Sequence, residues 1–193
     1  MTHWFTADWH LGHENVLKYQ PNRKYHSIEE MNLHIIGEYR EKVDRGDTVW
    51  ILGDLTLHPD PDYMLGILYD LPGMIRVVRG NHDQWAKRTE ENHQSGRIMI
   101  YDDRIIETRV NGQRLVLSHY PMEGWPGKRY TGPRHSGESV LPDLEGAWHL
   151  HGHSHGRSVQ RPLRLDVGWD TADRLLSWED VKFTIETEYS YAV

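Results

Sequence analysis

Five short clusters of aspartate, asparagine and histidine are the parts of this chain best equipped for chemistry. The clusters are Asp8-Trp9-His10, Gly53-Asp54, Gly80-Asn81-His82-Asp83, Ser118-His119-Tyr120 and His151-Gly152-His153-Ser154-His155. Their oxygen and nitrogen donors have borderline hardness, which suits Mn, Fe, Ni, Zn or Co better than Mg or Ca. A carboxylate such as that of Asp54 can bridge two cations, and two cations about 3.5–4 Å apart can clamp a phosphoryl group and the oxygen that attacks it. Together the clusters predict a two-metal site.

Each cluster also has an ordinary explanation when taken alone. An Asp-x-His pair is common, Gly-Asp after a strand is usually a turn, and Asn-His-Asp can cap a helix. The run from His151 to His155 is more specific, because alternate residues of an extended chain face the same way. Even this run occurs in proteins that bind metal only adventitiously. The site is favoured because all five clusters fall where a strand is expected to end.

The first half of the chain predicts strands that alternate with helices. Apolar runs predict strands over residues 3–7, 48–52 and 74–78, and helical spacing predicts helices over 14–20, 28–43 and 61–71. This alternation favours parallel strands joined by right-handed crossovers. Ligands of such sheets bind beyond the carboxyl ends of the strands, where the polar clusters lie.

The second half predicts a different pairing of strands. A hairpin is expected over residues 104–117 with Asn111-Gly112 at its turn, and further strands are expected over 147–150, 164–167 and 182–188. Parallel and antiparallel strands are therefore expected together. At 193 residues, the whole chain (1–193) is expected to form one α/β domain.

Composition and charge exclude several classes of protein. The chain has 14 histidines, no cysteine and a net charge of −7, so disulfides, thiolate metal sites and cysteine nucleophiles are ruled out. The acidic balance disfavours stable binding to duplex nucleic acid. No apolar run approaches the roughly 18 residues of a membrane span, and the first ten residues are typical of a strand rather than a signal peptide. We expect a cytoplasmic protein with no membrane partner, and nothing in the sequence specifies an oligomeric state.

The order of the motifs resembles that of the calcineurin-like metallophosphoesterase superfamily, and in particular its small bacterial and phage members. Asp-x-His, Gly-Asp, Gly-Asn-His-Asp, His and Gly-His-x-His follow one another from Asp8 to His155, over most of the chain. The resemblance implies a four-layer αββα sandwich of two mixed β-sheets and a metal-dependent phosphoric ester hydrolase. Gly53-Asp54 is not followed by the Asp-Arg-Gly of the protein phosphatase branch, which disfavours dephosphorylation of proteins.

The resemblance also implies roles for individual residues. Two divalent cations, with manganese preferred over Fe, Ni, Zn or Co, would be held by two sets of ligands that share one carboxylate: Asp8, His10, Asp54 and His155, and Asp54, Asn81, His119 and His153. A hydroxide bridging the metals would attack phosphorus in line, and His82 would assist the leaving group as the catalytic imidazole. His151 has no ligand role in the pattern and is expected to be structural.

The substrate is expected to be a small phosphate ester. Four residues are candidate substrate contacts. His13 and His58 lie beside ligand motifs and would contact the substrate or support the ligands. Trp125 and Arg129 belong to a segment, 120–140, that would cover a nucleotide as a lid or else form a solvated surface loop. We expect hydrolysis of small phosphodiesters, cyclic nucleotides such as 2′,3′-cyclic nucleoside monophosphates among them. A metal-dependent nuclease and a phosphomonoesterase are the alternatives. A non-catalytic binding module is disfavoured, because every ligand and His82 are intact.

Overall fold

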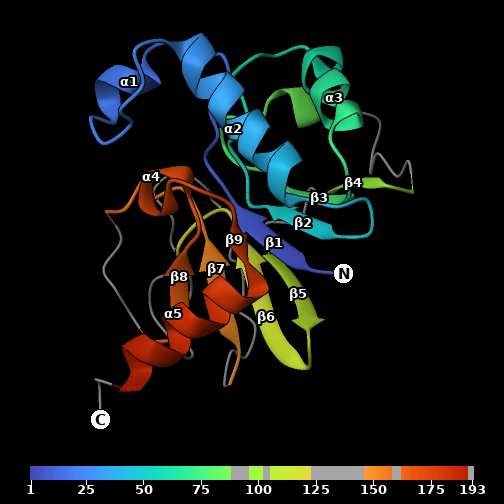
Figure 1. The fold of residues 1–193 in the computed structure, drawn as a ribbon, viewed down its shortest axis with the longest axis vertical. Helices are drawn as coiled ribbons and strands as arrows, with labels where there is room; N and C mark the ends of the chain where they lie inside the picture. The colour runs from blue at the N-terminus through green and yellow to red at the C-terminus, as the bar shows by residue number, and fades with distance from the viewer. Residues whose placement is uncertain (88–95, 102–104, 123–145, 158–161, 191–193) are drawn as a thin grey trace.

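The computed structural model describes residues 1–87, 96–101, 105–122, 146–157 and 162–190. Within these residues the strands form two mixed sheets (Figure 1). The first sheet has the order β4-β3-β2-β1-β9 and consists of β1 (His3–Thr6), β2 (Thr48–Ile51), β3 (Met74–Val78), β4 (Ile98–Tyr101) and β9 (Leu176–Ser177). Strands β1 to β4 are parallel, and β9 pairs with β1 in the antiparallel sense.

The second sheet has the order β5-β6-β7-β8. It consists of β5 (Ile105–Val110), β6 (Gln113–Ser118), β7 (Trp148–His151) and β8 (Arg164–Asp166). Strands β5 and β6 form the hairpin that the Asn-Gly turn predicts, and β6, β7 and β8 are parallel to one another. Strands β4 and β9 have no counterpart among the elements expected from the sequence.

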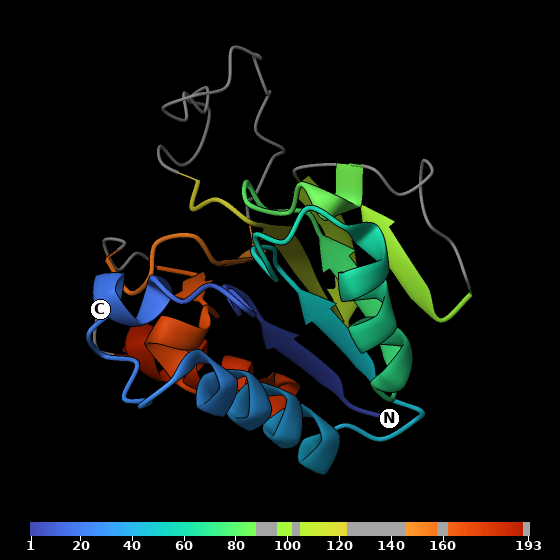
Figure 2. The same ribbon diagram turned by 90° about the horizontal axis from the view of Figure 1, so that it is seen from above.

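Two helices cover the outer face of the first sheet (Figures 1 and 2). They are α2 (Ile28–Lys42) and α3 (Pro61–Asp70), and the short helices are α1 (Val16–Tyr19), η1 (Trp85–Lys87) and α4 (Trp169–Ala172). Helix α2 begins where Ser27 accepts a hydrogen bond from the main-chain N–H of Glu30, which is the bond expected of an N-cap serine in the pattern Ser27-Ile28-Glu29-Glu30. Its buried residues Met31, Ile35 and Tyr39 recur every four positions and pack into the core beneath it.

The strand expected over residues 182–188 is wrong, because this segment belongs to helix α5 (Trp178–Ser190). The alternation of apolar and polar residues suggests a strand, but Phe183 is 72% exposed, whereas Val181 and Ile185, four residues apart, are buried. A reciprocal capping pair precedes the helix: Asp180 accepts from the main-chain N–H of Ser177, and Ser177 Oγ accepts from that of Asp180. The helical period of the buried residues decides the structure of this segment.

The core between the sheets places their strand ends next to one another. Phe5 and Leu52 of the first sheet share one apolar cluster with Leu117 and Leu150 of the second, and α5 adds Val181 and Ile185 to it. The expected α/β class with two mixed sheets is therefore confirmed. In the part of the chain that the structure describes, we find no helix long and apolar enough to cross a lipid bilayer.

Candidate metal centre

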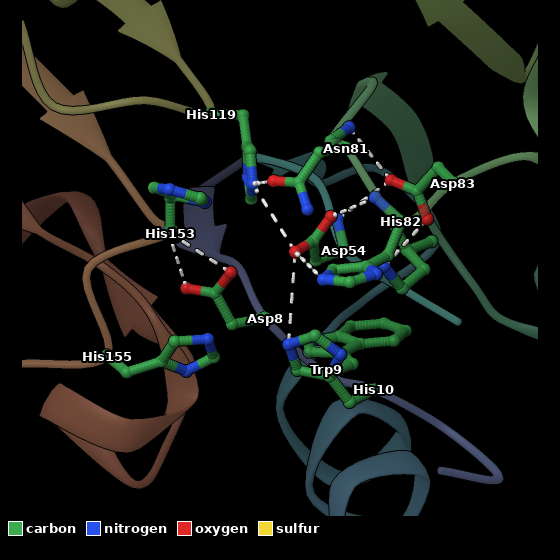
Figure 3. A network of polar contacts seen from close by, with 12 residues as sticks. Asp8, Trp9, His10, Asp54, Asn81, His82, Asp83, His119, His153 and His155 are labelled. Atoms are coloured by element: carbon green, nitrogen blue, oxygen red, sulfur yellow. Dashed lines mark hydrogen bonds and ion pairs between the residues drawn. The ribbon is translucent and has the colours of Figure 1, made fainter. Parts of the chain in front are cut away.

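The polar clusters follow strands of both sheets and meet in one place (Figure 3). Asp8 follows β1, Asp54 follows β2, Asn81 follows β3, His119 follows β6 and His153 follows β7. Strands β1 to β3 are parallel, and so are β6 and β7, so each sheet presents its carboxyl ends to the same region. This convergence is what the sequence predicts from its strand ends.

Asp54 lies at the centre of the group. Its Oδ2 atom is 3.4 Å from Nε2 of His119 and 3.9 Å from the Nε2 atoms of both His10 and His82. Its Oδ1 atom accepts a hydrogen bond of 2.9 Å from the main-chain N–H of His82. One oxygen is therefore tied to the backbone, and the other stands among three imidazoles (Figure 3).

The first group of donors consists of Asp8, His10 and His155, whose ligand atoms lie within 4.8 Å of one another. His10 is buried, and neither of its ring nitrogens has a hydrogen-bond partner among the residues that the structure describes. A buried polar atom without a partner is costly and is rarely left so. A cation between these three side chains would satisfy His10, so the group fits a metal ion.

The second group consists of Asp54, His119 and His153, which also lie within 4.8 Å of one another. The ring of His119 is oriented by a hydrogen bond of 2.8 Å between Nδ1 and the main-chain oxygen of Leu52. Its Nε2 atom then faces Oδ1 of Asn81 at 3.0 Å, together with Oδ2 of Asp54. Three electron-pair donors that converge in this way need a proton or a cation between them, and the donor set suits a transition metal.

The backbone is strained at the ligands themselves. Among the described residues, eight residues other than glycine have a positive φ, and five are candidate ligands with φ between 49° and 65°: Asp8, His10, Asp54, His153 and His155. Such conformations are uncommon outside glycine and cost about 1–3 kcal/mol each. They persist only where the surrounding structure enforces them, which is typical of functional sites.

Glycine allows the loops to approach closely. A Cβ atom on Gly152 would lie 2.5 Å from Cβ of Ala7 and 2.8 Å from Oδ2 of Asp8. With glycine at this position, the next residue, His153, donates its main-chain N–H to both oxygens of Asp8, at 3.1 and 2.9 Å. The same requirement holds at Gly53, where a Cβ would lie 2.7 Å from Nδ1 of His119.

Burial and the neighbouring charges shift the pKa values of these groups strongly. Burial raises the pKa of Asp8 to about 7 and lowers that of His10 to about 3. Burial also opposes ionisation of Asp54, but the nearby imidazoles of His119, His10 and His82 hold its pKa below the usual range. Burial disfavours the charged form of His119, yet Asp54 and Asp8 raise its pKa to about 9. Burial thus disfavours the charged form of Asp8, and a bound cation would stabilise that form.

The other residues that the sequence predicts for the site lie in different places. His82 is exposed at the edge of the centre, with its ring 5.6 Å from that of His10, and the half-buried ring of His13 lies 5.8 Å from His10 on another side. His58 is exposed, and its ring lies 4.5 Å from that of Tyr63 at an angle of 31°. Trp125 and Arg129 lie outside the described residues.

His151 stays outside both groups of donors. It is buried, its Nδ1 atom is 2.8 Å from the main-chain oxygen of Gly152, and its ring lies 5.2 Å from that of His149. These contacts are consistent with the structural role that the motif implies.

Three buried charged residues support the centre and were not singled out by the sequence pattern. Asp83 accepts hydrogen bonds from the main-chain N–H groups of Asp54, Leu55 and Gly80. Arg23 and Asp170 form an ion pair of 2.6 Å beside His155. Asp83 stands next to His82 in its motif, which is a usable signal, whereas no spacing connects Arg23 with Asp170.

Comparisons with known proteins agree with this geometry. Residues 1–168 match the family model of the calcineurin-like phosphoesterase superfamily domain. The Gene 66 protein of Mycobacterium phage D29 is 29% identical over 194 residues, which cover 93% of each chain. An uncharacterized protein of Methanocaldococcus jannaschii is 29% identical over 154 residues, 79% of this chain and 69% of the relative.

A solved structure shows the same fold. The protein of unknown function from Aquifex aeolicus superposes with a TM-score of 0.67 at 24% identity, covering 95% of this chain and 99% of that chain. The family model, which spans residues 1–168, carries the assignment of the family. The chain therefore belongs to the calcineurin-like phosphoesterase superfamily.

Proposed function

We propose that this protein is a metal-dependent phosphodiesterase that hydrolyses small substrates, cyclic nucleotides such as 2′,3′-cyclic nucleoside monophosphates among them. The observation that carries the proposal is the position of Asp54, whose Oδ2 atom stands between the two groups of donors and within 3.9 Å of the exposed His82. A carboxylate shared in this way is suited to bridging two cations.

The residues that would hold two divalent cations, manganese by preference, are the seven that the motifs predict: Asp8, His10, Asp54, Asn81, His119, His153 and His155. Bound divalent cations supply Lewis acidity toward a phosphoryl oxygen and lower the pKa of water. Asp54 and Asp8 contribute the negative charge that binds the cations, and Asn81 contributes a neutral oxygen. The surrounding structure enforces a positive φ at five of these residues and so holds their side chains in place before a substrate arrives.

His82 is the exposed residue of this centre, whereas the candidate ligands are buried or partly buried. Its side chain is 44% exposed, whereas those of His10, His119 and Asp54 are buried. Its backbone is held by the hydrogen bond to Asp54, so the residue is kept at the edge of the centre. From this position it can donate a proton or a hydrogen bond to the leaving oxygen of an ester.

The contacts of Arg23 favour a diester over a monoester as the substrate. Its guanidinium contacts the main-chain oxygens of Asp8 and Trp9, but it is buried and also donates to Asp170. It is therefore not free to bind the doubly charged phosphate of a monoester. A diester carries a single negative charge and depends less on such a partner.

A hydrolysis panel on metal-stripped protein, assayed with and without Mn²⁺, tests the proposal. The panel contains a bis-aryl phosphodiester, an aryl phosphate, 2′,3′- and 3′,5′-cyclic nucleotides, and single-stranded nucleic acid. We expect Mn²⁺-dependent hydrolysis of the small diesters, its loss in Asp54→Ala, and no change in Asp60→Ala, since Asp60 only caps α3. Hydrolysis of the aryl phosphate alone, or a higher kcat/KM for nucleic acid than for every small diester, would contradict it.

A further inference from the structure

A buried ion pair lies directly behind the first group of donors. Arg23 donates from Nε to Oδ1 of Asp170 at 2.7 Å and from Nη2 to Oδ2 at 2.6 Å. The side chains of Arg23 and Asp170 are 1% and 0% exposed. A two-pronged contact of this kind fixes the plane of the carboxylate as well as its position.

The same carboxylate orients His155. Oδ2 of Asp170 accepts a hydrogen bond of 2.6 Å from Nδ1 of His155. Because Nδ1 is engaged, Nε2 is the nitrogen of His155 that remains available to Asp8 and His10. The neighbouring rings of His155 and His10 are stacked, with centroids 5.3 Å apart.

Arg23 connects this pair to the backbone that carries the other two donors. Its Nη1 atom donates to the main-chain oxygen of Trp9 at 3.0 Å, and its Nη2 atom donates to that of Asp8. The guanidinium therefore joins α4, the segment before α2 and the strained turn at Asp8 and His10. Burial opposes a charge on Asp170, but Arg23 and His155 hold its pKa well below the usual range.

The second group of donors is supported differently. Nδ1 of His119 bonds to the neutral main-chain oxygen of Leu52 and not to a carboxylate. A carboxylate partner makes an imidazole a stronger ligand than a carbonyl does, because it favours the positive charge that develops on the ring. The two groups therefore differ in the partner of one histidine each: a carboxylate stands behind His155 and a neutral carbonyl stands behind His119.

We propose that Asp170 and Arg23 are positioning residues for the metal ion bound by Asp8, His10 and His155, and that they strengthen binding at this group selectively. Asp170 fixes the tautomer of His155 that is protonated at Nδ1. Arg23 holds Asp170 and the turn at Asp8 in fixed positions relative to His155. The inference rests on the proposed two-metal centre, but it concerns metal affinity and not the reaction.

Titration of the metal-stripped protein with Co²⁺, followed by visible absorption and calorimetry, tests the inference. In Asp170→Asn we expect one equivalent of Co²⁺ to bind about 10–100-fold more weakly, with the other equivalent unchanged. In a His155→Ala background, Asp170→Asn should cause no further loss, because Asp170 acts through His155. Equal weakening of both equivalents, or wild-type affinity for both, would overturn the inference.

A matched variant and a measurement on the wild-type protein complete the design. Glu107→Gln removes a carboxylate that pairs with Arg114 at 2.7 Å on the β5–β6 hairpin, and it should leave both equivalents unchanged. If Asp170→Asn does not fold, nitrogen NMR of the Zn²⁺-loaded wild-type protein decides the question. We expect the His155 ring, assigned by its absence in His155→Gln, to be protonated at Nδ1, and protonation at Nε2 would overturn the inference.

The inference and the proposed function fail in different ways. Selective weakening in Asp170→Asn, in a protein that hydrolyses none of the phosphodiesters, would support the inference and contradict the proposed function. The opposite result is also possible: the wild-type protein shows Mn²⁺-dependent phosphodiesterase activity, and Asp170→Asn binds both equivalents of Co²⁺ with normal affinity. That result would support the proposed function and contradict the inference.

Discussion

Oδ2 of Asp83 accepts a hydrogen bond of 2.7 Å from the main-chain N–H of Asp54 and another of 2.9 Å from that of Gly80. The carboxylate therefore ties the loop after β2 to the loop after β3. Its Oδ1 atom also accepts from the N–H of Leu55 and from Nε1 of Trp85. One buried side chain thus holds Asp54 at a defined distance from Asn81 and His82.

Replacing Asp83 with alanine should destabilise the metal-free protein. The N–H groups of Asp54, Leu55 and Gly80 would lose their acceptor in a buried place, and we expect the free energy of unfolding to fall by at least about 3 kcal/mol. Urea unfolding monitored by circular dichroism measures this, with the half-exposed Glu107→Ala as the control. A loss below about 1 kcal/mol would show that Asp83 does not join the loops.

His82→Ala should separate metal binding from turnover. His82 lies at the edge of the centre and is not part of either group of donors, so two equivalents of metal should still bind. Removing a group that assists the leaving oxygen should lower kcat by about 100-fold or more. Steady-state kinetics and metal analysis of the same preparation check both statements, and the exposed His26→Ala serves as the matched control. Full activity in His82→Ala would refute its catalytic role.

Gly152→Ala should disturb the centre without removing any ligand. The added methyl group would meet Ala7 and Asp8 and displace the main chain that bonds Asp8 through His153. We expect weaker metal binding and a free energy of unfolding lower by about 1–3 kcal/mol. Gly66→Ala in α3 meets no atom within 4 Å and should be neutral or stabilising by up to about 1 kcal/mol. Calorimetry measures the metal affinity of both variants, and urea unfolding measures their stability. If Gly152→Ala and Gly66→Ala had the same metal affinity and the same free energy of unfolding, the role of Gly152 would be contradicted.

His149 should make the metal-free protein less stable as the pH falls below neutral. Burial lowers its pKa well below the ordinary value of 6.5, and within the described part of the chain its Nδ1 atom has no hydrogen-bond partner. Between pH 6.5 and the lowered pKa, the unfolded chain binds a proton at this residue and the folded chain does not, so stability decreases as the pH falls.

His149→Gln removes this pH-dependent contribution. Relative to the variant, the wild-type protein should therefore lose about 2 kcal/mol of stability between pH 7.5 and pH 5. Urea unfolding at a series of pH values, in the presence of a chelator, measures the difference. A difference that does not change with pH would mean that His149 titrates normally in the folded protein.

Much of the candidate site could be predicted from the sequence, because its ligands follow strands that are recognisable locally. The apolar runs before Asp8, Asp54 and Asn81 indicate parallel strands, whose carboxyl ends meet at one edge of a sheet. The order of the motifs then identified the family before any contact was known. The start of the α2 helix was equally clear from Ser27 and Glu30: Ser27 Oγ accepts from the main-chain N–H of Glu30, and the Glu30 side chain accepts from that of His26.

Other segments were ambiguous because local pattern and packing disagree. The alternation over residues 182–188 favours a strand, yet the burial of Val181 and Ile185 against the sheets makes this segment a helix. The capping pair of Ser177 and Asp180 is a local signal for that helix. Such conflicts are resolved by the surface that the segment covers, which a single sequence does not specify.

The sequence by itself determined the family, the chemistry of the donors and the order in which the strands present them, because these depend on residue type and short-range spacing. Only the tertiary structure decided that Arg23 pairs with Asp170, 147 residues away, and that this pair stands behind His155. It also decided that His58 turns toward Tyr63 while His13 lies beside His10. The physical reason is that such contacts arise from the packing of distant elements, and no local spacing encodes them.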